Sequence, residues 1–257
     1  MPAKTITTLL LGDVHGEPGC RAIFSKLKSL KDRYHADFVI ANGENCCKGF
    51  GLSVENMNML FTQGVDVITS GNHIWQNEEI LPYLDSESRL LRPANYGNLV
   101  SGHGFTVYKD IGVINLIGRQ MMISAEDPFR FASDIVRKLK TQVKTIFVDF
   151  HAESSDEKEA MSFFLDGQVT AVVGTHTHVQ TADERILKGG TAYITDMGMC
   201  GPEDSVIGGD VETSIKKQKT QMPLKAKVSE NSACLNGVCI VSDAQSGQAI
   251  SITRFTE

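Results

Sequence analysis

The chain has 257 residues, of which 41% are hydrophobic and 22% are charged, an ordinary composition for a soluble globular protein. Its 31 acidic and 25 basic side chains give a formal net charge of −6. This charge disfavours a partner that is a long nucleic acid, because such partners are bound by basic stripes. A net charge of −6 is still compatible with a small anionic substrate if a local site supplies positive charge. No linker, low-complexity tract or repeat divides the chain, so we expect one domain over residues 1–257.

The N-terminal sequence and the cysteines predict a cytoplasmic protein. The first apolar run ends at Gly12 and Asp13, which is too short for a signal core or for a membrane span of about 20 residues. We therefore expect no membrane partner. No pair of cysteines has C-x-x-C spacing, which favours reduced thiols over a disulfide framework. The six are Cys20, Cys46, Cys47, Cys200, Cys234 and Cys239.

Short apolar runs alternate with helical patterns through the first two thirds of the chain. The runs are β-branched and bounded by turn residues, which predicts buried strands at 5–11, 37–41, 65–69, 112–117, 145–149 and 170–173. Apolar residues at three- and four-residue spacing predict helices at 22–33, 54–63, 128–139 and 155–165, the last with Ser155 at a capped start. Strand followed by helix, repeated, is typical of a layered α/β fold.

The last third of the chain has the pattern of strands that close such a fold. Residues 191–195 read as a strand after the turn at Gly189 and Gly190. Residues 225–228, 233–241 and 248–255 alternate like antiparallel strands.

Histidine is the informative residue type, because five of the seven histidines come directly after predicted strands. In open α/β sheets, ligands bind outside the carboxyl ends of the strands. Five segments at these ends carry carboxylates, amides or imidazoles: residues 12–16, 42–45, 71–73, 149–153 and 174–178.

These side chains suit divalent metals such as Mn, Fe and Zn, which accept oxygen and imidazole ligands. Two metals about 3.5–4 Å apart need a bridging carboxylate and several neutral ligands, because too many anions quench their Lewis acidity. Asp13 and Glu44 supply the charge. The neutral donors are Asn45, Asn72, His151, His176 and His178. We expect residues 176–178 to be extended, with both imidazoles on one side and each available to one ion.

Each segment taken alone has a plainer interpretation. An aspartate after a strand is favoured in turns, Asn45 and Asn72 can stabilise turns, and Glu44 can be a solvated carboxylate. The conjunction of five such segments at strand ends favours the metal site. His35 and His103 have no comparable neighbours, so we expect them to be exposed or satisfied in the core.

The segments GDVHG, NGEN, GNH, DFHAE and GTHTHVQT, in this order, resemble the motifs of the calcineurin-like metallophosphoesterases. The chain is more closely similar to the YmdB-like branch of bacterial dimetal phosphodiesterases, which keeps G-E-N where most relatives have an aspartate motif. The resemblance runs from about residue 5 to about residue 255. It implies a layered α/β/β/α sandwich in which two mixed β-sheets are flanked by helices.

The resemblance also implies a role for each motif residue. Each metal would have three ligands of its own: Asp13, Asn45 and His178 for the first, and Asn72, His151 and His176 for the second. Glu44 would bridge the two ions. His73, directly after Asn72, matches the family's catalytic histidine, which protonates the leaving oxygen.

The activity that the resemblance implies is hydrolysis of small phosphodiesters, with nucleoside 2′,3′-cyclic monophosphates as the usual substrates of the branch. It implies two divalent ions per chain, iron or manganese in preference to zinc or magnesium, and a homo-oligomer. Two alternatives stay open. One is a phosphomonoesterase or phosphoprotein phosphatase on the same dimetal site, and the other is a nucleotide-binding regulatory protein.

His15 departs from the pattern of the branch, which usually has an apolar residue at this position. The wider superfamily has a histidine there that binds the first metal. In an extended segment, alternate side chains point to the same side, so Asp13 and His15 would face the same way. We hypothesise that His15 joins the first metal site. A histidine that packs against loops is the equal alternative, because entry into a helix at Gly16 can turn the side chain away.

Overall fold

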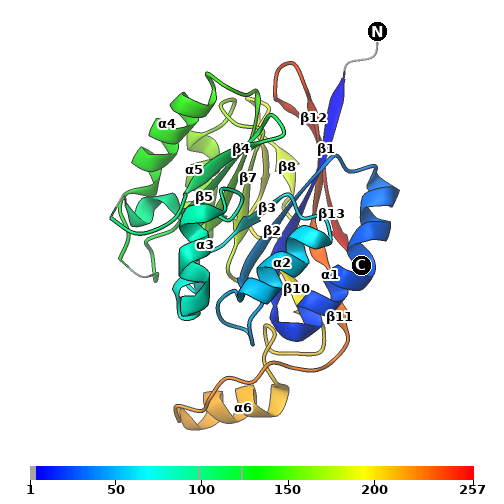
Figure 1. The fold of residues 1–257 in the computed structure, drawn as a ribbon, viewed down its shortest axis with the longest axis vertical. Helices are drawn as coiled ribbons and strands as arrows, with labels where there is room; N and C mark the ends of the chain where they lie inside the picture. Colours follow the sequence, from blue (N-terminus) through cyan, green and yellow to red (C-terminus); the bar gives the residue numbers. More distant parts are fainter. Residues whose placement is uncertain (1–3, 98, 123) are drawn as a thin grey trace.

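The computed structural model describes residues 4–97, 99–122 and 124–257, which form two β-sheets packed face to face with helices on both outer sides (Figure 1). The first sheet has the order β11-β10-β1-β12-β13, with β2 beside β1 and β3 beside β2. Its strands are β1 (Thr5–His15), β2 (Phe38–Asn45), β3 (Val67–Thr69), β10 (Met199–Pro202), β11 (Ala233–Cys234), β12 (Asn236–Asp243) and β13 (Ala249–Thr256).

The second sheet has the order β4-β5-β6-β7-β9-β8. Its strands are β4 (Phe105–Tyr108), β5 (Ile111–Ile117), β6 (Thr145–His151), β7 (Ala171–Thr175), β8 (Arg185–Ile186) and β9 (Ala192–Ile194). The strands from β5 to β9 along this order pair in parallel, and β4 and β8 pair antiparallel at the two edges. The first sheet also combines both kinds of pairing. The predicted sandwich of two mixed sheets is confirmed.

Helices cover the two outer faces. The α-helices are α1 (Gly16–Tyr34), α2 (Val54–Thr62), α3 (Leu81–Ser86), α4 (Pro128–Leu139), α5 (Ser155–Phe164) and α6 (Val211–Thr220). Short 3₁₀ turns are η1 (Ile74–Gln76), η2 (Glu78–Ile80) and η3 (Ala94–Tyr96). In the described part of the chain, no helix is both long and apolar enough to cross a membrane.

The alternation of side chains along β1 shows how the sequence builds the layers. Leu9 and Leu11 pack with Ile23 and other residues of α1, whereas Leu10 lies between the two sheets with Phe147 of β6. Successive side chains of a strand point to opposite faces, so an unbroken apolar run indicates a strand buried on both sides. The chemistry-bearing residues therefore lie at the strand ends, where the apolar runs stop.

One sequence-based expectation for the last third is wrong, and one helix there was not predicted. Residues 225–228 do not form a strand, because the alternating lysines and apolar residues have no neighbouring strand, and only an isolated bridge joins Val228 to Gly209. Helix α6, not expected from the sequence, precedes this segment and stands off the body of the protein (Figure 1). Helix α5 begins at Ser155 as expected, but its N-cap is Ser154.

Candidate metal centre

The predicted ligands come from both sheets and meet at one edge of the sandwich. Asp13 lies near the end of β1, and Glu44 and Asn45 end β2. His151 is the last residue of β6, and His176 follows β7 directly. Because the parallel strands end at the same edge, His176 contacts Asp13 although the two are 163 positions apart in the chain.

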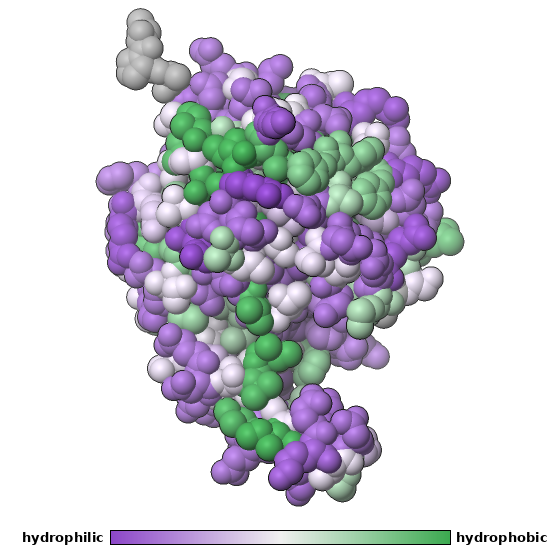
Figure 2. Space-filling view, turned by 180° about the vertical axis from the view of Figure 1, so that it is seen from behind, coloured by the Kyte–Doolittle hydropathy of each residue, from purple (hydrophilic) through white to green (hydrophobic). Residues whose placement is uncertain are grey.

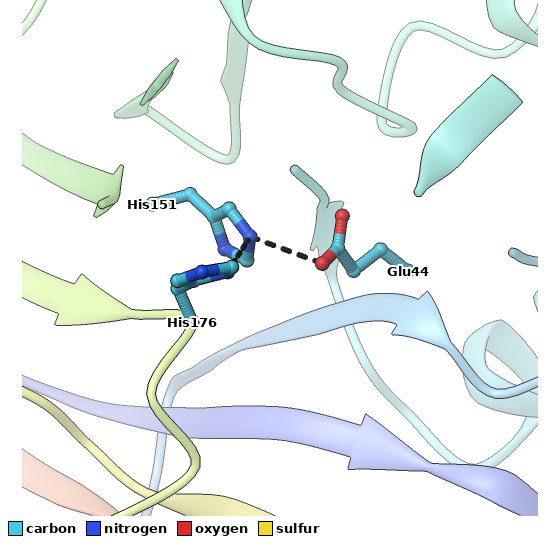
Figure 3. Close-up of side chains that lie close together, drawn as sticks. All are labelled: Glu44, His151 and His176. Atoms are coloured by element: carbon cyan, nitrogen blue, oxygen red, sulfur yellow. Dashed lines mark hydrogen bonds and ion pairs between the residues drawn. The ribbon is translucent and has the colours of Figure 1, made fainter. Parts of the chain in front are cut away.

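His151 is the centre of the cluster. Its Nε2 lies 3.0 Å from Glu44 Oε1 and 3.1 Å from His176 Nδ1 (Figure 3). The same nitrogen lies 3.1 Å from Asn72 Oδ1. The His151 side chain is fully buried. A Cβ atom at Gly71 would lie 2.1 Å from the His151 ring, so only glycine lets the backbone before Asn72 pass this close. Three of the predicted ligands of the second metal thus converge with the predicted bridge.

Asp13, Asn45 and His178 form the other part of the cluster. His178 Nε2 lies 3.2 Å from Asn45 Nδ2, and His178 Nδ1 donates to the carbonyl of Ile207 at 2.9 Å. That bond leaves Nε2 as the ring nitrogen that carries the lone pair, which faces Asn45 Nδ2. Asp13 is fully buried, with Oδ1 3.8 Å from His151 Nδ1, and Oδ2 accepts from the backbone N–H of His176.

The backbone of residues 176–178 does not have the extended conformation that the sequence analysis expects. Strand β7 ends at Thr175, and His176 and His178 have φ of 103° and 66°, so the segment is not extended. His176 turns toward His151, and His178 turns toward Asn45. Each imidazole nevertheless lies in a different part of the cluster; that each serves a different ion stays a prediction.

Two buried oxygen atoms show that this cluster fits metal ions. Asp13 Oδ1 and Glu44 Oε1 accept no well-directed hydrogen bond from the residues that the structure describes, and the group nearest to each is the His151 ring, 3.8 Å from Asp13 Oδ1 and 3.0 Å from Glu44 Oε1. A buried carboxylate oxygen without a donor is costly, and a divalent cation would satisfy it. Glu44, His151 and His176 each place a ligand atom within 4.8 Å of the others. Carboxylate, amide and imidazole donors are the set that Mn, Fe and Zn accept.

The charges of the cluster depend on one another in the absence of metal. Burial raises the pKa of Glu44, but His151 and His73 outweigh burial and bring it down to about 2. Burial lowers the pKa of His151, but the carboxylates of Glu44 and Asp13 outweigh burial and raise it to about 9. A ligand imidazole must be neutral, so metal binding at His151 replaces a proton.

His73 lies against this cluster rather than inside it. Its backbone N–H donates to Glu44 Oε2 at 2.9 Å, and its Nδ1 lies 2.8 Å from Asn45 Oδ1. The ring of Phe50 contacts the His73 ring edge to face, with centroids 5.0 Å apart. Burial lowers the pKa of His73, while Glu44 opposes this shift. Nδ1 is thereby fixed, and Nε2 is the nitrogen left for a reacting group.

The family model for the YmdB-like proteins matches residues 9–255 of the chain. The chain belongs to the YmdB-like family. A Bacillus subtilis relative described as a 2′,3′-cyclic-nucleotide 2′-phosphodiesterase is 44% identical over 251 residues, which cover 96% of this chain and 95% of the relative. This similarity confirms the predicted enzyme class, a phosphodiesterase.

Two solved structures share the fold of this YmdB-like protein. A phosphatase from Mycoplasma pneumoniae has a TM-score of 0.94 and 37% identity, covering 99% of this chain and 94% of the other. A hypothetical protein from Thermus thermophilus has a TM-score of 0.91 and 36% identity, covering 98% and 99% of the two chains.

Behind His151 lies a hydrogen-bonded chain that the sequence analysis did not assign. The hydroxyl of Thr175 lies 2.9 Å from His151 Nδ1 and 2.7 Å from Asp149 Oδ1. Burial raises the pKa of Asp149 to about 6, so its carboxylate is ionised at neutral pH and only accepts hydrogen bonds. Thr175 therefore donates to Asp149 and accepts from His151 Nδ1–H, so that Nε2 would offer its lone pair at the predicted metal position once a metal replaced the Nε2 proton. The period of two along β6, which puts Asp149 on the face of His151, was the available signal.

A buried ion pair holds the loop that carries His176 and His178. Lys158 Nζ donates to Asp196 Oδ2 at 2.8 Å, and both side chains are almost fully buried. The same Oδ2 accepts from the backbone N–H of Thr177 at 3.1 Å, and Oδ1 accepts from that of Gly198 at 2.8 Å. The carbonyl of Gly198 in turn accepts from the N–H of Asp13. One carboxylate thus positions the backbone at two ligand segments.

His15 lies beside the first part of the cluster. Its ring centroid is 5.2 Å from that of His178, and its buried Nδ1 has no hydrogen-bond partner among the described residues. The ring also fills the space between Gly49 and Gly208, where an added Cβ would lie 3.1 Å and 2.5 Å from His15 Nε2. Burial lowers its pKa to about 3, so the ring is neutral. Its membership of the metal site stays a prediction.

A cavity of about 410 Å³ opens in front of the cluster, within the range of small-molecule pockets. Its lining includes Glu44, His73, His176 and His178 of the cluster. It also includes residues of α6 and of the segment 224–228. A larger cavity of about 580 Å³ lies near the start of β1, at the opposite end of that strand from Asp13, and contains no histidine in its lining.

Proposed function

We propose that this YmdB-like protein is a dimetal phosphodiesterase that hydrolyses nucleoside 2′,3′-cyclic monophosphates. The observation that carries the proposal is a pair of buried carboxylate oxygens, Asp13 Oδ1 and Glu44 Oε1, that accept no well-directed hydrogen bond and lie against the His151 ring. Glu44 also lines the cavity beside the cluster. The substrate is inferred from the name of the Bacillus subtilis relative. Opening the ring at the 2′ oxygen would yield a nucleoside 3′-monophosphate.

The ligand sets follow the two parts of the cluster. One metal would be held by Asp13, Asn45 and His178, the other by Asn72, His151 and His176, with Glu44 between them. The family resemblance favours iron or manganese as the metal. The chemistry supplied by divalent ions bound there is activation of water and neutralisation of charge on the phosphoryl oxygens.

His73 would act as the general acid. It holds a proton on Nδ1 against Asn45 Oδ1 and, when protonated, a second proton on Nε2. Transfer of the Nε2 proton to the 2′ oxygen avoids the departure of a strongly basic alkoxide. The contact with Glu44 fixes the His73 backbone, so the ring is positioned before substrate arrives.

A phosphorus NMR assay tests the proposal. Metal-loaded protein is offered a nucleoside 2′,3′-cyclic monophosphate, a linear dinucleotide and an aryl monophosphate under the same conditions. The proposal predicts conversion of the cyclic nucleotide to the 3′-monophosphate at the highest rate. Preference for the aryl monophosphate would favour a phosphatase, and nucleotide binding with no turnover would favour a regulatory protein.

A further inference from the structure

Helix α6 reverses the usual arrangement of a surface helix. Thr213, Ser214, Lys217 and Gln218 lie on one face and line the cavity of the metal centre. Val211 and Ile215, the apolar residues of the helix, are exposed, and no residue of α6 is buried. Figure 2 shows that hydrophobic side chains remain at the surface of the projecting part of the molecule that carries α6, which we call the arm. A surface helix normally turns its apolar stripe inward, so α6 is not placed by core packing.

The cavity in front of the metal cluster is lined by basic side chains as well as by predicted ligands. Four lysines line it: Lys48, from the segment after β2, and Lys217, Lys225 and Lys227, from α6 and the segment 224–228. We name these four the lysine wall. The lysines that form ion pairs in the described part of the chain are Lys109 and Lys158, so the lysine wall contributes none. The two acidic residues of the cavity are Glu44, in the metal cluster, and Glu153, whose Oε2 lies 3.1 Å from His176 Nε2. In a chain of net charge −6, this gathering of free ammonium groups points to an anionic ligand.

A cyclic mononucleotide does not account for the lysine wall. It carries one phosphate group, and the metal centre would hold that group. The four lysines of the wall are additional to the predicted metal ligands, so further negative charge on the same ligand accounts for them. Exposed Phe50, beside His73, and Leu224 also line the cavity and offer surfaces for nucleobases.

We propose that the lysine wall binds the internucleotide phosphates of a short single-stranded RNA whose 3′ end carries the 2′,3′-cyclic phosphate. This inference rests on the proposed function. Such ends form when a ribose 2′-hydroxyl attacks the adjacent phosphorus and expels the next nucleotide. In the reaction here, water adds to phosphorus, the bond from phosphorus to the 2′ oxygen breaks, and that oxygen takes a proton. The product is an RNA with a 3′-phosphate and a free 2′-hydroxyl.

A kinetic comparison of two substrates tests the inference. One is a nucleoside 2′,3′-cyclic monophosphate, and the other is a trinucleotide with the same cyclic end. Wild-type protein should have a kcat/KM about 10-fold or more higher for the trinucleotide, and this advantage should shrink as salt rises, because phosphate contacts release counterions. In Lys217→Ala/Lys225→Ala, kcat/KM for the trinucleotide should fall about 10 times more than that for the mononucleotide.

The control variant is Lys140→Ala/Lys144→Ala, which removes two exposed lysines from the cavity near the start of β1. It should retain the trinucleotide advantage. Equal kcat/KM for the two substrates in wild-type protein, or equal losses on both in the lysine-wall variant, would overturn the inference.

A binding measurement separates this inference from the proposed function. The probe is a fluorescent trinucleotide with a 3′-phosphate, titrated into metal-loaded protein and followed by anisotropy. Weakening of about 10-fold in the lysine-wall variant, with no change in the control variant, supports the RNA site even if neither cyclic substrate is hydrolysed. Equal binding by wild-type and lysine-wall proteins would overturn the inference even if the mononucleotide is hydrolysed.

Discussion

The hydroxyl of Thr175 accepts a hydrogen bond from His151 Nδ1 at 2.9 Å and donates its own hydrogen to Asp149. This relation sets the tautomer of the ligand at the centre of the cluster. Groups that orient a metal ligand in this way are worth about 10- to 100-fold in metal affinity.

We therefore expect Thr175→Val to lower the affinity for the second metal by about 10- to 100-fold. Calorimetric titration of stripped protein with Mn²⁺ measures this. Thr106→Val is the matched control, because it makes the same change at a buried threonine of the same sheet, in β4. Unchanged affinity in Thr175→Val would show that the hydroxyl does not orient His151.

The role of His73 predicts a loss of turnover without a loss of metal. His73→Asn should lower kcat for a cyclic nucleotide by about 10²–10⁴ while both ions stay bound. The loss should be smaller for an aryl phosphodiester, whose leaving group needs no proton. His103→Asn, at an exposed histidine that contacts the Asp85 carbonyl, is the control. Full turnover of the cyclic nucleotide, whose leaving group is an alkoxide, by His73→Asn would show that His73 is not the general acid.

The buried pair of Lys158 and Asp196 predicts a large stability effect. Asp196→Asn leaves the Lys158 ammonium buried without its counter-charge, which should lower the free energy of unfolding by about 3–5 kcal/mol. Urea denaturation measures it. Glu159 lies on α5 with Lys158 and forms an exposed pair with Arg185 of β8. Glu159→Gln removes one charge from that pair and should cost at most about 1 kcal/mol. Equal effects of the two substitutions would contradict the account of the buried pair.

His15 offers a test of the first metal site. Its unpartnered buried Nδ1 beside His178 leads us to expect that His15→Leu lowers the affinity for one of the two ions by about 10-fold. Metal titration and a metal-bound crystal structure check this. A His15 nitrogen well beyond about 2.0–2.3 Å from either ion, with affinity unchanged, would make His15 a packing residue.

The strand-end segments were predictable because two independent signals coincide there. The apolar run of β1 stops shortly before Asp13, and β6 ends at His151, so the strand pattern and the ligand type mark the same positions. The geometry of residues 176–178 was not predictable, because the Asp196 carboxylate that holds Thr177 comes 19 positions later in the chain. Only the folded sheet brings the two together.

Helix α6 escaped prediction for a related reason. Its cavity side is polar and its apolar residues are exposed, so it lacks the apolar stripe by which a helix is predicted. The alternation of Lys225 to Val228 suggested a strand because period-two patterns do not reveal whether a partner strand exists. What this segment faces is a cavity, and that contact depends on the path of the whole arm.

Metal stoichiometry tests the central claim most directly. Protein stripped of metal, reloaded with Mn²⁺ and freed of unbound ions is analysed by mass spectrometry for metal per chain, beside His176→Ala and His178→Ala. The account predicts two ions per chain in the wild type and about one in each variant, because the two histidines would serve different ions. One ion or none in the wild-type protein, or two in both variants, would contradict it.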